Sequence, residues 1–275
     1  MILNGVKFFR SMDKGIAAKK FIELIEIVEK LRGPDGCPWD KEQTHQSLLQ
    51  YFLEETYEVI ESVDEKNWSL LKEELGDVLL HIVLQAQIAK ETNKFDISNS
   101  LETINNKLIK RHPHVFGDKN INGSVKAKQN WEEIKHEEKK RKSRIDGVPA
   151  KLPELVRSQR LQEKASFAGF DWDNVDAVWA KVHEEIDELK LAQEKGNTEN
   201  IKEELGDVLF SIVNLSRFLN FSAEDMLRFA NQKFKFRFQF IEKELEENGK
   251  NLEGLNQKEM DQMWKKAKKN RIENI

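Results

Sequence analysis

The chain has 275 residues with a formal net charge of −4, which argues against binding to a nucleic-acid polymer because proteins that bind the phosphate backbone usually carry a basic excess. One cysteine, Cys37, excludes an internal disulfide and is typical of a reducing compartment. The sequence holds no apolar run long enough to span a membrane and no adequate signal peptide, so we expect a cytoplasmic protein with no membrane partner.

Helical periodicity predicts an all-α fold. Residues 1–20 are predicted to be an N-terminal extension, and apolar residues then recur at helical spacing from Phe21 to Leu31. The same spacing recurs over 71–83 and again over 201–213. Only 13 glycines and 5 prolines interrupt the chain, which favours long amphipathic helices over sheets and turns.

An internal duplication organises these helices. Residues 73–79 and 203–209 have the same seven residues, Glu-Glu-Leu-Gly-Asp-Val-Leu, and the acid-rich segments 54–58 and 184–188 are separated by the same offset. Because the order of these landmarks is the same throughout, we predict two tandem helical-bundle domains, 21–140 and 154–275. The joint, 141–153, follows a basic run and ends in turn residues, as a linker would.

Each predicted domain carries two pairs of acids, and within a pair the residues are three apart, so they share a helix face. The pairs are Glu55 with Glu58, Glu74 with Asp77, Glu185 with Glu188, and Glu204 with Asp207. In the second domain the turn signal Lys195-Gly196-Asn197-Thr198 lies midway between the two pairs. A reversal there makes the helices antiparallel and brings four carboxylates to one level.

Such a cluster favours a hard divalent cation, because like charges raise one another's pKa and a cation relieves the repulsion. Carboxylate ligands without paired Cys or His predict Mg²⁺, with Mn²⁺ as a substitute. The competing interpretation is a solvated helix face, which is common in a chain rich in Glu. Facing pairs that occur twice favour the metal site.

Further motifs resemble the MazG family of all-α nucleotide pyrophosphohydrolases. Residues 36–40 read Gly-Cys-Pro-Trp-Asp, 43–45 read Gln-Thr-His, and 110–117 read Lys-Arg-His-Pro-His-Val-Phe-Gly. Together with the acid pairs, the resemblance runs from about Phe21 to Lys268. It implies a homodimer that uses Mg²⁺ to hydrolyse nucleoside triphosphates or deoxynucleoside triphosphates to the monophosphate and pyrophosphate.

The resemblance also assigns residues and implies that the second copy is the catalytic one. The catalytic and metal-binding residues would be Glu185, Glu188, Glu204 and Asp207, and the nucleotide-binding residues would be Lys181, Glu184, Lys233, Arg237, Trp264 and Lys268. The first copy keeps a possible second metal site, made by Glu55, Glu58, Glu74 and Asp77. It also keeps counterparts of the nucleotide-binding residues, Lys107, Arg111, Trp131 and Lys135.

The copies differ beside their acids. Tyr51 stands where the second copy has Lys181, and Leu84 stands where it has Asn214. We therefore expect turnover mainly in the second copy. Two other functions stay open: a helical interaction protein without catalysis, and a relative specific for one nucleotide, such as dUTP or phosphoribosyl-ATP. The duplication argues against the latter.

Overall fold

The computed structural model describes residues 13–121 and 123–272, and these residues form helices with no strand among them. The predicted all-α class is confirmed. The contacts divide the chain into two compact units, 1–120 and 121–275. In the part of the chain that the structure describes, no helix is long and apolar enough to cross a membrane.

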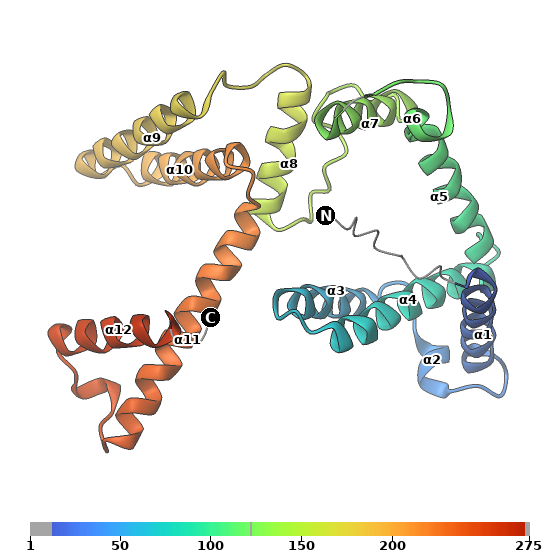
Figure 1. Cartoon of the computed structure of the whole chain (residues 1–275), viewed down its shortest axis with the longest axis horizontal. Helices are drawn as coiled ribbons and strands as arrows, with labels where there is room; N and C mark the ends of the chain where they lie inside the picture. Colours follow the sequence, from blue (N-terminus) through green and yellow to red (C-terminus); the bar gives the residue numbers. More distant parts are fainter. Residues whose placement is uncertain (1–12, 122, 273–275) are drawn as a thin grey trace, which may run out of the picture. The chain divides into compact units, whose positions relative to one another are not determined.

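The first unit is built around a long helical hairpin (Figure 1). Its helices are α1 (Lys14–Arg32), α2 (Pro38–Glu42), α3 (Leu49–Asp64), α4 (Trp68–Glu91), α5 (Ile97–Arg111) and α6 (Pro113–Phe116). Helices α3 and α4 form the hairpin, and α1 packs against α4. Helix α1 begins inside the predicted extension 1–20, and residues 1–12 of that extension lie outside the described residues.

The second unit repeats the hairpin with α9 and α10. Its helices are α7 (Ser124–Glu138), α8 (Glu154–Phe167), α9 (Val175–Lys195), α10 (Thr198–Phe218), α11 (Ala223–Glu247) and α12 (Gln257–Ile272), with a short 3₁₀ helix, η1 (Leu252–Gly254), before α12. The predicted linker, 141–153, joins α7 to α8 without a helix. Helix α7 belongs to the second unit by its contacts, since it packs on α8.

Local sequence explains the two hairpin turns. Gly196 ends α9 with a φ of 69°, a left-handed conformation that glycine adopts without strain, and the Asn197 side chain accepts hydrogen bonds from two backbone N–H groups of α10. In the first unit Lys66 has a φ of 56°, and Asn67 caps α4 through the N–H of Leu70. Gly196 therefore lies at the midpoint predicted from the acid spacing, and Lys66 lies at the equivalent point, midway between Glu58 and Glu74.

Separate apolar clusters hold the helices. In the first unit the buried cluster joins α1, α4 and the residue before α3, and consists of Val28, Leu48, Val83, Leu84 and Ile88. In the second unit Val178, Val182 and Leu215 lie between α9 and α10. A third cluster, made by Ile241, Leu245 and Ala267, holds α12 on α11.

Candidate active site

The hairpins bring carboxylates together in both units, as the sequence predicts. Carboxylate oxygens of Glu185, Glu188 and Glu204 lie within 4.8 Å of one another in the second unit. The corresponding group in the first unit is Glu55, Glu58 and Glu74, at the same spacing. The fourth predicted acid of each set, Asp207 or Asp77, lies outside these groups of three.

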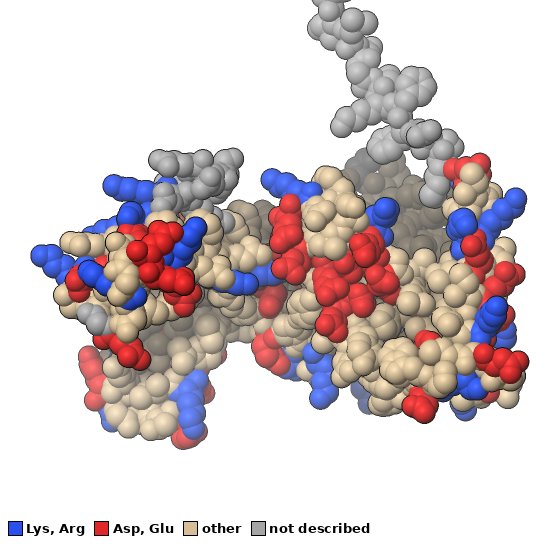
Figure 2. All heavy atoms as spheres, turned by 90° about the horizontal axis from the view of Figure 1, so that it is seen from below, with Lys and Arg blue, Asp and Glu red and all other residues tan. Residues whose placement is uncertain are grey.

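The charges in each group affect one another. Burial, together with the negative charges of Glu58, Asp77 and Glu74, raises the pKa of Glu55 to about 7. Burial and the charges of Glu188 and Glu185 likewise raise the pKa of Glu204 above its ordinary value. Figure 2 shows acidic side chains gathered densely where the α3–α4 hairpin lies in Figure 1. The carboxylates within each group therefore repel one another when all of them are ionised.

Lysine 181 is the cation that the second unit adds to its acids. Its Nζ lies 2.7 Å from a carboxylate oxygen of Glu184 and 2.7 Å from one of Glu185. Hydrogen bonds to these two carboxylates raise the pKa of Lys181 above its usual range, so the side chain stays charged. The structure thus brings together the predicted residues Lys181, Glu184 and Glu185.

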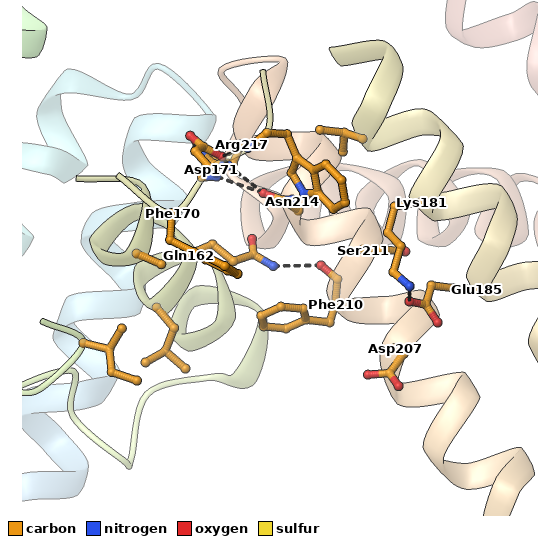
Figure 3. A pocket seen from close by; sticks show the side chains of 15 residues that line it. Gln162, Phe170, Asp171, Lys181, Glu185, Asp207, Phe210, Ser211, Asn214 and Arg217 are labelled. Atoms are coloured by element: carbon orange, nitrogen blue, oxygen red, sulfur yellow. Dashed lines mark hydrogen bonds and ion pairs between the residues drawn. The ribbon is translucent and has the colours of Figure 1, made fainter. Parts of the chain in front are cut away.

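A cavity of about 550 Å³ opens beside these acids within the second unit. Its walls come from α8, α9, α10, the segment between α8 and α9, and Ile145 of the segment between α7 and α8. Glu185, Asp207 and Lys181 lie at its acidic end, and Phe170, Trp172 and Phe210 contribute aromatic surface (Figure 3). A pocket of this size, mostly apolar and with a few polar groups, suits a small organic ligand with a charged end.

Polar side chains fix the opposite end of the pocket. The Arg217 guanidinium forms a bidentate pair with Asp171, with its Nη1 donating to Oδ2 at 3.0 Å, and it donates through Nε to Asn214 Oδ1 at 3.0 Å. From α8, Gln162 Nε2 donates to the Phe210 backbone carbonyl at 2.9 Å. These bonds hold the walls of the pocket in a defined arrangement.

Four predicted nucleotide-binding residues do not line this pocket. Lys233 and Arg237 lie on α11, and Trp264 and Lys268 lie on α12. The Arg237 guanidinium stacks over the Trp264 ring at 5.2 Å, and Trp264 packs against the cluster that joins α11 to α12. The structure therefore brings Arg237 and Trp264 together, and none of the four residues lines the pocket beside the carboxylates.

The sequence reasoning missed the pair Asp171–Arg217 and the side chain of Gln162. Asp207, Ser211 and Asn214 are spaced by four and then three residues, so they follow one face of α10 and mark a polar stripe. That stripe was a signal for one wall. No local signal marks Gln162, because α8 reaches the pocket only through tertiary packing.

The carboxylate groups fit a hard divalent cation. They offer only oxygen ligands, their oxygens converge within 4.8 Å, and their mutual repulsion is the kind that a cation relieves. Neither Cys nor His belongs to either group of three, so the donor set does not suit Zn²⁺. The residues of both groups can thus bind a divalent metal ion.

Fold and site together define an all-helical protein with a duplicated hairpin, whose carboxylate groups can hold a metal ion. The MazG nucleotide pyrophosphohydrolase domain matches this chain at residues 43–116 and 174–239, once in each hairpin region. The chain belongs to the MazG family.

Similar proteins support this assignment along nearly the whole chain. The nucleoside triphosphate pyrophosphohydrolase/pyrophosphatase MazG of Thermotoga maritima is 50% identical over 250 residues, which are 90% of this chain and 95% of that protein. The nucleoside triphosphate pyrophosphohydrolase of Escherichia coli K12 is 40% identical over 256 residues, 91% of this chain and 97% of that protein. YabN, an uncharacterised protein of Bacillus subtilis, is 43% identical over 252 residues, 90% of this chain and 52% of its own length.

Proposed function

We propose that this chain hydrolyses nucleoside triphosphates and deoxynucleoside triphosphates to nucleoside monophosphate and pyrophosphate, and that it does so with Mg²⁺. The observation that carries the proposal is the pocket of about 550 Å³ whose acidic end is formed by Glu185, Asp207 and Lys181. A nucleoside fits the apolar part, and the phosphates then lie beside the carboxylates. The names of the Thermotoga and Escherichia relatives support the same reaction.

Glu185, Glu188, Glu204 and Asp207 would hold the metal. A bound divalent cation supplies charge neutralisation for the phosphate oxygens and a more acidic water. Lys181 balances the charge of the phosphates from the α9 side, and Glu184 holds the lysine in place at 2.7 Å. The attacking water would be activated either by the metal or by a carboxylate of this group that accepts its proton.

A homodimer completes the proposal. Leu205, Leu209 and Ile212 follow one face of α10 and are 49%, 55% and 41% exposed, and an exposed apolar stripe of this kind is typical of a protein interface. In such a dimer a second copy would supply Lys233, Arg237, Trp264 and Lys268 to the nucleotide, since these residues do not line the pocket of their own chain. The single cysteine agrees with a cytoplasmic location.

The test is a panel of the common ribonucleoside and deoxyribonucleoside triphosphates, with separate detection of pyrophosphate and phosphate. We expect pyrophosphate and the monophosphate from several bases in Mg²⁺, and no turnover in EDTA. Release of the diphosphate with free phosphate would contradict the proposed reaction. Turnover of one base alone would indicate a specific relative, and the absence of turnover with every base would favour a helical interaction protein.

A further inference from the structure

One buried polar atom in the pocket has no partner. Gln162 lies on α8, is 8% exposed and lines the cavity. Its Oε1 is buried and has no hydrogen-bond partner among the described residues. Leaving an acceptor buried and unpaired is unfavourable, so such an atom indicates a bond that forms only when the pocket is filled.

The orientation of this amide is fixed by its other half. Gln162 Nε2 donates to the backbone carbonyl of Phe210 at 2.9 Å, and a carbonyl can only accept. A flipped amide would place two oxygen acceptors against each other. The oxygen must therefore point away from Phe210, and Figure 3 shows it turned into the space between α8 and the side chains of Asn214 and Asp171.

The surroundings of this oxygen suit the edge of a planar heterocycle. Phe210, Phe170 and Trp172 line the same cavity and offer apolar and aromatic surface for a ring. Lys181, which can bind a phosphate, and Asp207, a proposed metal ligand, line the cavity as well. A base that lies in this cavity meets an acceptor at Gln162. The 6-amino group of adenine and the 4-amino group of cytosine are donors at the position where guanine, uracil and thymine carry a carbonyl oxygen, so only the first two can donate to Oε1 from that position.

We propose that Gln162 determines base preference: its Oε1 accepts a hydrogen bond from the exocyclic amine of adenine or cytosine in the pocket. The inference rests on the proposed function for the identity of the ligand class, a nucleotide. It makes the pocket the base site, and leaves Trp264 to contact the nucleotide from outside this cavity.

The chain offers a matched control on the same helix. Gln159 lies one turn before Gln162, and unlike Gln162 it bonds through both halves of its amide. Its Nε2 donates to the Phe221 carbonyl at 3.3 Å, and its Oε1 accepts from the N–H of Ala223 at 2.9 Å. Both of its bonds are internal and it does not line the pocket, so Gln159 has only a structural role in the same packing.

The experiment compares two ligands that differ by one amine. Calorimetric titration of the full-length protein in Mg²⁺ would measure the Kd of AMP and of purine riboside 5′-monophosphate, which lacks only the 6-amino group. We expect the wild type to bind AMP roughly tenfold to a hundredfold more tightly, because the analogue leaves Oε1 unpaired. Gln162→Met should bring the two Kd values together, while Gln159→Met should keep the wild-type ratio.

Each outcome decides the proposal. Equal Kd values in the wild type, an unchanged ratio in Gln162→Met, or no binding of AMP would overturn it. A ratio that collapses equally in Gln159→Met would show a packing effect and would also overturn it. Because the Kd measurement needs no turnover, it is independent of the pyrophosphate assay. A protein that hydrolyses triphosphates without discriminating AMP from the analogue would refute this inference and leave the proposed function standing.

Discussion

The two repeats hold the same acids on the same kind of hairpin, but they differ in the space beside those acids. In the second unit Asn214 and Lys181 line a cavity of about 550 Å³. In the first unit Leu84, which stands in the place of Asn214, is 3% exposed and belongs to the buried cluster. Tyr51, in the place of Lys181, packs against the same cluster.

This difference shows that the arrangement of the carboxylates and the shape of the pocket have separate structural causes. The acid group depends on a short hairpin with two local turns, and both units keep it at the same spacing. The pocket depends on the side chain at one position of the hairpin, which is Asn214 on α10 in the second unit and Leu84 on α4 in the first. When that position carries an aliphatic side chain the space becomes core, which stabilises the unit by apolar burial and leaves less room for a ligand.

The last helices of the repeats differ as well. Trp264 and Lys268 lie on α12, which packs on α11 of its own repeat. Their counterparts in the first repeat, Trp131 and Lys135, lie on α7, which packs on α8. There Lys135 Nζ lies 3.7 Å from Glu132, so the charge that could bind a nucleotide takes part in a structural ion-pair network.

The largest expected effect separates the two acid groups. Glu188→Gln removes a negative charge from the second group, and we expect turnover to fall by at least about a thousandfold, or about 4 kcal/mol in the activation free energy. Glu58→Gln makes the same change in the first group, and we expect less than about a twofold loss, because Leu84 and Tyr51 take the place of the pocket's polar wall. Steady-state rates of pyrophosphate release measure both.

Circular dichroism would show that both variants keep their helices. If the two substitutions lower the rate of pyrophosphate release equally, or if Glu58→Gln lowers it more, then the first repeat is catalytic. The assignment of activity to the second repeat would then be wrong.

The next effect concerns α7 and its place beside α8. Glu132 is 8% exposed, and its carboxylate lies 3.1 Å from Nζ of Lys164, which is 4% exposed, and 2.9 Å from Arg160. Glu132→Gln leaves Lys164 buried without its counter-charge, so we expect unfolding to require about 3 kcal/mol less in a denaturant titration. Its exposed neighbour is the control, and Glu133→Gln should change stability by less than about 0.5 kcal/mol.

The same residue gives a pH dependence. Burial raises the pKa of Glu132, but Lys164, Lys135 and Arg160 lower it more, and the net pKa is below the ordinary value. A lowered pKa stabilises the fold above the unfolded pKa of about 4.3, and this contribution is lost as the pH falls through the folded pKa. The stability gap between wild type and Glu132→Gln should therefore narrow below about pH 4. A gap that stays constant would show that ionised Glu132 does not hold α7 on α8.

The sequence was sufficient wherever the determinants are local. Glycine 196 and the acid spacing predict the turn and the convergence of Glu185, Glu188 and Glu204, because a helical hairpin converts sequence distance into position along the helices. The contrast between Asn214 and Leu84 also correctly marks which repeat has the polar wall.

The other features of the site depend on packing between segments that are distant in the sequence, and the helical periodicity of apolar residues does not predict such packing. Gln162 reaches the carbonyl of Phe210 only because α8 lies against α10, and Asp171 meets Arg217 across a similar separation. Helix α7 was assigned to the first repeat by its matching Trp131 and Lys135, but its contacts put it with the second unit. The ion pairs of Glu132 with Lys164 and Arg160 lie within that packing and have no local pattern in the sequence.

The smallest expected effect tests whether the acids of the first repeat form a metal site or a solvated face. Burial and the charges of Glu58, Asp77 and Glu74 raise the pKa of Glu55 to about 7, so ionising it near pH 8 opposes folding. Glu55→Gln removes that repulsion, and in EDTA we expect a melting temperature a few degrees higher, equivalent to less than about 1 kcal/mol after solvent screening. The variant should also gain less stability from added Mg²⁺, since it lacks one ligand. Glu54→Gln, on an exposed neighbour, should leave both values unchanged. Equal melting temperatures and an equal gain in stability from Mg²⁺ in the wild type, Glu55→Gln and Glu54→Gln would mean that these acids only form a solvated surface. The two repeats would then share the helical hairpin but not a metal site.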